Sequence, residues 1–284
     1  ADLLALGDLY AGAGQYDRAL EYYRRIETAG APVPDLADRI AAVLDPGPLT
    51  EHNKSIDLPG SHLEVRHFGP ILDGEFETAL KAAWLRVRAA LGDEALQGPL
   101  LVTVYPNRRA FRENAGYRVG SMVKGNYTLG HASVFQAPSH TALEWVAVLT
   151  HEIAHHAVAR LSGGQAPRWL SEGVARYVEG DSAVVDRARL RARLQAGALQ
   201  PTGRLDEVMD RAWNDAVTIL DARDEALLAV EEMARRHGSG GLTELLVRMV
   251  NPSADFGAVV RSTLGADLAE IDAAWRALLA GEGP

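Results

Sequence analysis

Two histidines and a glutamate near the middle of the chain have the spacing of a metal centre. His151, Glu152 and His155 stand in the order H-E-x-x-H inside an apolar stretch that predicts a helix. Residues four apart on an α-helix lie one turn apart on the same face, so the two imidazoles can converge on one ion. The nitrogen donors suit tetrahedral zinc, at distances of about 2.0–2.1 Å. Glu152 lies beside that face, where it can accept a proton from a water molecule that the metal activates.

A catalytic zinc site usually takes a third protein ligand and leaves a fourth position open. Residues 166–180 read A-P-R-W-L-S-E-G-V-A-R-Y-V-E-G, and their proline favours the start of a second helix. Glu172 falls in the first two turns of that helix. Gly163 and Gly164 predict the turn that brings the second helix back antiparallel to the first. Glu172 is therefore the expected third ligand, and Glu179 is a rival with a less suitable spacing.

The pairing of H-E-x-x-H with W-L-x-E-G resembles the gluzincin group of metallopeptidases, in particular the peptidase MA-like domains that are often attached to helical repeats. The resemblance covers residues 55–280, and its distinctive sequence patterns fall within residues 140–180. It implies a peptidase that binds one zinc ion per chain and acts on a peptide or protein substrate. It makes His151, His155 and Glu172 the zinc ligands. It makes Glu152 the general base.

The same resemblance leaves the stabilisation of the oxyanion open. Gluzincin peptidases usually add a tyrosine or histidine that donates a hydrogen bond to the tetrahedral oxyanion, and such a donor is worth about 2.7–4 kcal/mol. The chain has no tyrosine after Tyr177, and the segment 219–233, where related domains often carry one, contains none. The remaining candidates for this role or for substrate binding are Tyr127, His131, Tyr177 and His237. His237 lies at the end of a predicted helix, where capping is an equally good explanation.

Neighbouring residues have several predicted roles. His156 lies about 100° round the helix from His155, which favours a structural or supporting role over metal ligation. Trp169 is expected in the core. One turn after Glu172 stands Arg176 rather than an acid, so the imidazoles must be oriented by another group, and Glu179, Asp181 or a backbone carbonyl could serve. The strand predicted over residues 127–135 resembles the edge strand beside which an extended peptide substrate lies.

The pattern of predicted elements indicates an α+β fold, with strands first and helices afterwards. Alternation predicts strands over residues 62–68, 99–105 and 125–135, and helices over 75–91 and 108–115. From residue 141 onward nearly everything predicts helix, over 141–161, 167–179, 183–195, 205–212, 222–237, 240–250 and 256–280, with a break near Gly265. We expect a zincin-like peptidase domain over residues 49–284, with its active-site helices at 141–180 and a helical part at 181–284.

The first 44 residues predict a separate helical appendage. Residues 1–29 form two amphipathic segments joined at Gly12–Gln15, and a short helix follows at 35–44. The small Gly7 and Ala19, with Tyr10 and Tyr23 as gap fillers, resemble one tetratricopeptide repeat, although a leucine stands where the repeat favours tryptophan and its proline is displaced by one position. An ordinary helical hairpin is the alternative. Asp45, Pro46, Gly47 and Pro48 mark the linker to the next domain.

Composition excludes several classes of protein. The formal net charge is −9, and the nearest basic cluster, Arg187–Arg193, has the pattern of a solvated helix face, so a nucleic-acid partner is not expected. Without cysteine the chain has neither disulfides nor thiolate metal sites. No apolar run approaches the roughly 20 residues of a membrane span. No signal peptide is visible, and the chain opens without Met inside a helical pattern, so we expect any targeting signal upstream and leave the compartment open, an extracytoplasmic one included.

Two functions remain in competition. The first is a zinc peptidase with Glu152 as general base. The second is a zincin-like domain of weak or lost activity that serves, with its repeats, as a protein-binding module for a partner. The missing tyrosine favours the second, and the intact Glu152 favours the first.

Overall fold

The computed structural model describes residues 3–12, 16–30, 33, 35–44, 51–58, 61–68, 74–114, 125–128, 130–135, 141–180, 185–211 and 215–281. The fold is α+β, as predicted, with one five-stranded sheet and a largely helical second half. Asp45–Pro48, the predicted linker, lies outside the described residues.

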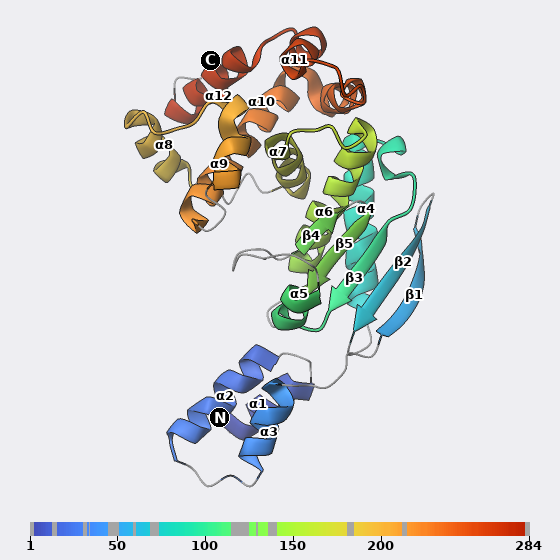
Figure 1. Ribbon diagram of the computed structural model, residues 1–284, viewed down its shortest axis with the longest axis vertical. Coiled ribbons are helices and arrows are strands. Elements are labelled where there is room, and N and C mark those ends of the chain that lie inside the picture. Colours follow the sequence, from blue (N-terminus) through green and yellow to red (C-terminus); the bar gives the residue numbers. More distant parts are fainter. Residues whose placement is uncertain are drawn as a thin grey trace.

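The sheet has the strand order β1-β2-β3-β5-β4 (Figure 1). Strand β1 pairs antiparallel with β2, β3 lies parallel to both β2 and β5, and β4 pairs antiparallel with β5 at the opposite edge. The strands are β1 (Glu51–Leu58), β2 (Ser61–Phe68), β3 (Leu101–Tyr105), β4 (Gly125–Thr128) and β5 (His131–Phe135). The segment predicted as one strand over residues 125–135 is therefore a hairpin of β4 and β5. Of these two strands, only β4 lies at the edge of the sheet.

Strand β1 was missed because most of its residues are polar and exposed. Only Ile56 and Leu58 are buried among its eight residues, so the alternation that marks a half-buried strand is confined to its end.

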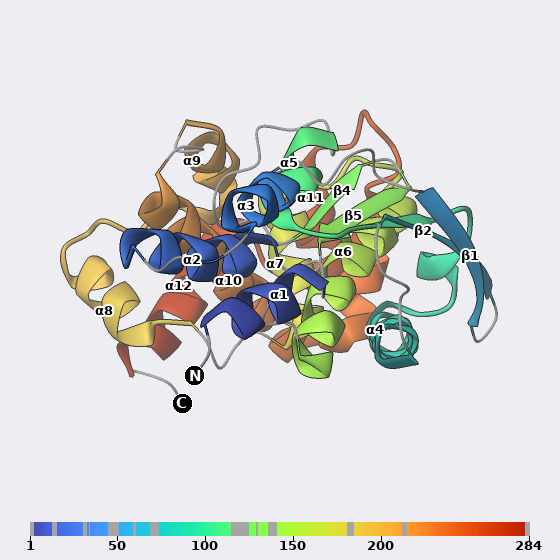
Figure 2. The same cartoon turned by 90° about the horizontal axis from the view of Figure 1, so that it is seen from below.

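Helices cover both faces of the sheet. Figure 2 shows α4 (Gly74–Leu91) and α6 (Ala142–Ser162) on one face and α5 (Arg108–Asn114) on the other. Val102 and Val134, which point to the first face, join the main hydrophobic core with α4 and α6. Tyr105 and Phe135, which point the other way, pack with Phe111 of α5 in a smaller cluster. This alternation along β3 and β5 follows from the two-residue period of a strand.

Among the C-terminal helices, α7 and α10 pack against α6, and the others lie beyond them, on the side away from the first three helices (Figure 1). They are α7 (Arg168–Glu179), α8 (Arg187–Gln195), α9 (Leu205–Arg211), α10 (Ala216–Arg248), α11 (Phe256–Leu264) and α12 (Leu268–Ala280). Helix α10 starts six residues earlier than predicted, with the side chain of Asp215 accepting hydrogen bonds from the first turn. It also runs through residues 238–239, which the prediction left between two helices, with a kink at Gly238.

The first three helices form a cluster of their own, drawn below the sheet in Figure 1. They are α1 (Leu3–Gly12), α2 (Tyr16–Thr28) and α3 (Leu36–Leu44). Tyr23 of α2 packs on Gly7 of α1, where an added Cβ would lie 2.4 Å from the tyrosine ring. The hydroxyl of Tyr23 donates a hydrogen bond of 2.7 Å to Asp8. The helices and the close approach at Gly7 agree with the prediction from sequence.

No helix in the described residues combines the length and apolar composition that a membrane span requires.

Candidate metal centre

Helix α6 presents His151 and His155 on one face, one turn apart. The helix is fixed at its start by a capping box between Thr141 and Glu144, and it ends at Gly163, whose φ of 60° is a left-handed conformation that glycine adopts without strain. Gly164 is also left-handed, and together the two glycines turn the chain into α7. The predicted turn and the antiparallel second helix are thus both present.

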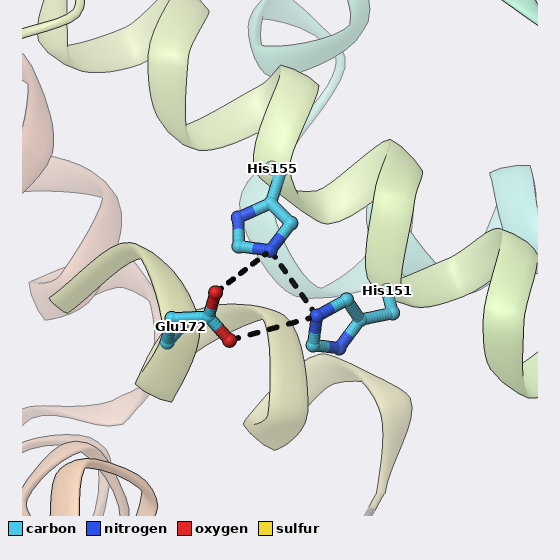
Figure 3. Close-up of side chains that lie close together, drawn as sticks. All are labelled: His151, His155 and Glu172. Atoms are coloured by element: carbon cyan, nitrogen blue, oxygen red, sulfur yellow. Dashed lines mark hydrogen bonds and ion pairs between the residues drawn. The ribbon is translucent and has the colours of Figure 1, made fainter. Parts of the chain in front are cut away.

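Glu172 extends from the second turn of α7 toward the two imidazoles (Figure 3). The Nε2 atoms of His151 and His155 lie 3.1 Å apart. One carboxylate oxygen of Glu172 lies 3.8 Å from His151 Nε2, and the other lies 3.8 Å from His155 Nε2. The ligand atoms of all three side chains fall within 4.8 Å of one another, so the structure brings together the three predicted metal ligands.

These residues fit a zinc ion in both donor type and spacing. Two imidazoles and one carboxylate are a donor set typical of catalytic zinc. Bonds of about 2.0–2.2 Å in a tetrahedron put the ligand atoms about 3.3–3.5 Å apart, and the observed distances of 3.1–3.8 Å bracket that value. The three side chains are only 12–16% exposed, which shields the centre from bulk solvent.

Both imidazoles are oriented by a partner on the nitrogen that faces away from the centre. Nδ1 of His151 lies 3.0 Å from a carboxylate oxygen of Glu179, and Nδ1 of His155 lies 2.8 Å from Oγ of Ser171. Partners of this kind fix the ring and raise its basicity as a ligand. Glu179 is thus a supporting residue and not a member of the three-ligand group, and Asp181, the other candidate for this support, lies outside the described residues.

Electrostatics differs between the two histidines. Burial lowers the pKa of His151, but the hydrogen bond that it donates to Glu179 and the charges of Glu152 and Glu172 outweigh burial and raise that pKa overall. Burial, helped by the neighbouring His151, lowers the pKa of His155 to about 3, so His155 stays neutral. A neutral imidazole is the form that binds a metal.

Glu152 is buried, with 4% of its surface exposed, and it packs against strand β4. An added Cβ on Gly125 would lie 2.4 Å from Oε1 of Glu152. Any residue larger than glycine at position 125 would therefore displace this carboxylate. Oε2 has no hydrogen-bond partner among the described residues. Burial raises the pKa of Glu152 to about 7, partly offset by the charge of His151. One oxygen of this buried carboxylate is thus without a partner in the described part of the chain, beside His151 on the same helix.

Arg223 of α10 is a fourth side chain of the centre, and the sequence analysis did not identify it. Its Nε and Nη2 lie 2.8 and 2.6 Å from the same carboxylate oxygen of Glu172, and Nη2 lies 3.3 Å from Nε2 of His151. Burial alone would raise the pKa of Glu172, but the Arg223 charge and the two histidines hold that pKa well below its usual range. Glu172 is therefore ionised, as a metal ligand must be.

Close packing between α7 and α10 positions Arg223 next to the three ligand side chains. Gly173 faces the backbone of α10, and an added Cβ would lie 2.6 Å from the carbonyl oxygen of Ala226. Ala226 lies about one turn from Arg223 on the same helix. The close contact between Gly173 and Ala226, which only glycine permits, therefore positions Arg223 next to Glu172. The glycine of the W-L-S-E-G segment thus has a packing role next to the third ligand.

A buried ion-pair network fixes α10 on both sides of Arg223. Arg176 of α7 donates a hydrogen bond of 2.6 Å to Asp224, and Arg189 of α8 donates one of 2.9 Å to the same carboxylate. Arg189 and Arg193 also lie 2.8 and 2.9 Å from the carboxylate of Asp221. The basic face of residues 187–193 is therefore not simply solvated, as its pattern indicated, because two of its arginines neutralise buried acids.

Two of the predicted oxyanion or substrate-binding candidates belong to the sheet. The hydroxyl of Tyr127 on β4 accepts a hydrogen bond of 2.8 Å from the backbone of Gly130 and lies 3.3 Å from Nδ1 of His156. His131 on β5 lies 2.7 Å from Oγ1 of Thr103, and both project from the sheet face that α5 covers, opposite α6. The structure does not bring either residue to the metal ligands.

The other two candidates are on helices. Tyr177 packs against the main core, and no hydrogen bond joins its side chain to a metal ligand among the described residues. His237 is exposed on α10. It lies 14 residues beyond Arg223, which places it about 21 Å further along the helix. Neither residue is therefore brought to the centre.

His156 and Trp169 have the structural positions predicted for them. His156 is buried, points away from the centre, and makes an edge-to-face contact with Tyr127, with ring centroids 5.8 Å apart. Trp169 is 2% exposed and packs edge-to-face on Phe256, so it is a core residue.

Comparison with known proteins gives weak structural neighbours only. No family model and no curated protein matches the chain. An M1 zinc metallopeptidase variant from Deinococcus radiodurans, solved with a Tyr-Ser-Ala substrate, has 16% identity and a TM-score of 0.44 over 81% of this chain. A two-domain M1 zinc metallopeptidase variant solved with L-arginine has 15% identity and a TM-score of 0.40 over 82% of this chain. The chain spans about half the length of these neighbours, 52% of each.

Proposed function

We propose that this chain is a zinc-dependent peptidase of the gluzincin type, with His151, His155 and Glu172 as the ligands of one zinc ion and Glu152 as the general base. The observation that supports this most strongly is the convergence of the three ligand atoms within 4.8 Å, beside a buried carboxylate without a hydrogen-bond partner. TM-scores of 0.44 and 0.40 add no weight, so the proposal depends on the site itself.

The residues divide the chemistry of hydrolysis between them. A zinc ion bound here would polarise the scissile carbonyl and lower the pKa of an attacking water molecule. Glu152 accepts the proton of that water and passes it to the amide nitrogen that leaves. A pKa near 7 suits both halves of this transfer, because the group must gain and lose a proton at neutral pH. Glu179 and Ser171 hold the imidazoles in place while this happens.

The substrate lies, in this proposal, along the outer edge of β4. Strand β4 is the last strand on that side of the sheet, and its Gly125 touches Glu152. A peptide paired with β4 through backbone hydrogen bonds would run past the general base. Such pairing places little demand on the side chains of the peptide, so a mixed peptide library is a suitable first substrate.

The test compares the parent chain with Glu152→Gln, measuring zinc by elemental analysis and cleavage of the library by mass spectrometry. Glu152→Gln should keep one zinc per chain and lose hydrolysis by about 10²–10⁴-fold, because the amide keeps the shape but cannot accept the proton. Glu207→Gln, at an exposed position of α9, is the matched control and should cleave at the parent rate. Cleavage by Glu152→Gln at the parent rate would remove Glu152 from the mechanism.

The alternative function, a zincin-like module that binds a partner without efficient turnover, makes a different prediction for the same experiment. The parent chain would carry zinc and leave the whole library uncut. The helices of residues 1–44 are the part of the chain that would recruit such a partner, as a repeat-like segment. Leu9 supports this, because 66% of its surface is exposed on α1. A chain that lacks residues 1–44 should keep its zinc, and loss of zinc from a folded truncated chain would contradict this division into domains.

A further inference from the structure

Arg223 reaches the centre from a third helix. It comes from α10, whereas the histidines come from α6 and Glu172 comes from α7. Its side chain is 25% exposed, and its guanidinium contacts Glu172. Among the described residues, this is the only cationic side chain that contacts both Glu172 and His151.

The way Arg223 pairs with Glu172 differs from a purely structural ion pair. A guanidinium that only neutralises a carboxylate typically makes two parallel hydrogen bonds to its two oxygens. Here Nε and Nη2 both approach Oε2, and no hydrogen bond to Oε1 is found among the described residues. Nη1 makes no hydrogen bond among the described residues. The two N–H groups of Nη1 therefore have no acceptor among the described residues.

The backbone of Arg223 is fixed by packing and ion pairs on both sides of it. Buried Asp221 and Asp224, on either side of it, hold α10 to α7 and α8. Gly173 holds the same stretch of α10 against α7. A donor mounted on such a rigid support is preorganised, which is the condition for strong electrostatic stabilisation of a transition state.

The contact with His151 locates the guanidinium relative to the reaction. Nη2 of Arg223 lies 3.3 Å from Nε2 of His151, the nitrogen that would bind the metal. A bound metal and Nη2 would compete for the lone pair of this nitrogen, so the contact between Nη2 and His151 would break when metal binds. Arg223 would then still be paired with Glu172, next to the ligand atoms that would surround the metal. No hydrogen bond or ion pair among the described residues joins Tyr127, His131, Tyr177 or His237 to one of the three ligand side chains.

We propose that Arg223 donates a hydrogen bond to the oxygen on which negative charge develops when water attacks the scissile carbonyl, the role that a tyrosine or histidine usually has in gluzincin peptidases. This inference rests on the proposed peptidase function. A charge-assisted donor of this kind is typically worth about 10²–10³-fold in kcat.

The test uses cobalt in place of zinc, because its visible spectrum reports changes of ligand, and methylphosphonate as a tetrahedral anion that imitates the developing charge. Parent, Arg223→Gln, Arg223→Lys and Arg248→Gln chains are first titrated with cobalt. Each is then saturated with cobalt and titrated with methylphosphonate. Arg248 is the matched control, since it is an exposed arginine near the other end of α10.

Arg223→Gln should bind cobalt at least as tightly as the parent, because a positive charge next to the cation has been removed. The loaded variant should bind methylphosphonate at least tenfold more weakly, Arg223→Lys should lie between the two, and Arg248→Gln should match the parent. Equal methylphosphonate affinity in the parent and Arg223→Gln would overturn the inference, and weaker cobalt binding in addition would make Arg223 a residue that only orients Glu172. A parent chain that binds cobalt but no methylphosphonate would also overturn it. A parent that binds neither cobalt nor zinc would overturn the proposed function itself.

Discussion

Gly173 of α7 packs directly on the carbonyl of Ala226 in α10, at a distance that leaves no room for a Cβ. This contact joins the helix that carries the third ligand to the helix that carries Arg223. The centre is therefore built by three helices, α6, α7 and α10, although the sequence pattern that marks it involves only the first two.

Gly173→Ala should destabilise the protein and weaken metal binding. Alanine is intrinsically better than glycine in a helix by about 1 kcal/mol. The new Cβ would nevertheless meet a backbone atom at 2.6 Å, and overpacking of this kind typically costs about 1–3 kcal/mol. We expect a lower urea midpoint together with a lower zinc affinity, because the clash at Gly173 would displace the adjacent Glu172 from His151 and His155.

Gly240→Ala is the matched control for this variant. It lies in α10, the helix on which Gly173 packs, and nothing lies within 4 Å of the added Cβ. Its urea midpoint should rise slightly or stay unchanged. A Gly173→Ala chain as stable as Gly240→Ala, with the zinc affinity of the parent, would show that the contact with Ala226 does not position the site.

Glu179→Ala should weaken zinc binding by about 10–100-fold without abolishing it, which is the usual effect of removing a group that orients a ligand. Glu179 meets His151 at Nδ1, the nitrogen that faces away from the centre. Glu172→Ala should lose zinc far more completely. Competition against a chelator of known affinity measures both. If the order is reversed, with Glu179→Ala losing zinc and Glu172→Ala keeping it, Glu179 is the third ligand instead.

Glu225 should make folding stability fall as the pH rises. It is buried on α10, where it accepts a hydrogen bond of 2.8 Å from the backbone of Gln200, and burial raises its pKa to about 7. Its pKa in the unfolded chain is about 4.3. The contribution of Glu225 to the free energy of unfolding is therefore fully present below that value. It falls by on the order of 3 kcal/mol as the pH rises through 7.

Glu225→Gln removes this titration and keeps the acceptor for Gln200. Its urea midpoint should change less than that of the parent between pH 5 and pH 8, and at pH 8 the variant should be the more stable of the two. Parallel pH profiles for the two chains would mean that Glu225 is ionised in the folded state at both pH values.

The sequence was sufficient for the parts of the site that depend on local spacing. His151 and His155 share a face because of the period of one helix, and Glu172 follows after one tight turn, so both are visible in a short window. Arg223 was not, because it meets Glu172 across 51 residues of sequence, through helix packing that no local pattern encodes. Two features of the sequence nonetheless pointed to this contact. Gly173, directly after Glu172, is small enough for another helix to pack closely there, and Arg223 lies inside the segment 219–233, where related domains often carry the oxyanion donor.

The fold shows the same division. Helices with strong periodicity formed within a few residues of their predicted bounds, as for α6 and α7. Strand β1 is an edge strand with only two buried residues, so its identity as a strand comes from pairing with β2, a non-local contact. The ion pairs of Arg189 and Arg193 with Asp221 are equally non-local, which is why a basic helix face was assigned to solvent.

The central claim is that His151, His155 and Glu172 hold one metal ion. The most direct measurement is the zinc content of the purified parent chain and of a His151→Ala, His155→Ala double variant, by native mass spectrometry with elemental analysis. The account predicts one zinc per parent chain and none in the double variant, with both chains folded by circular dichroism. A folded double variant that retains one zinc per chain, or a parent that takes up none at saturating zinc, would contradict it.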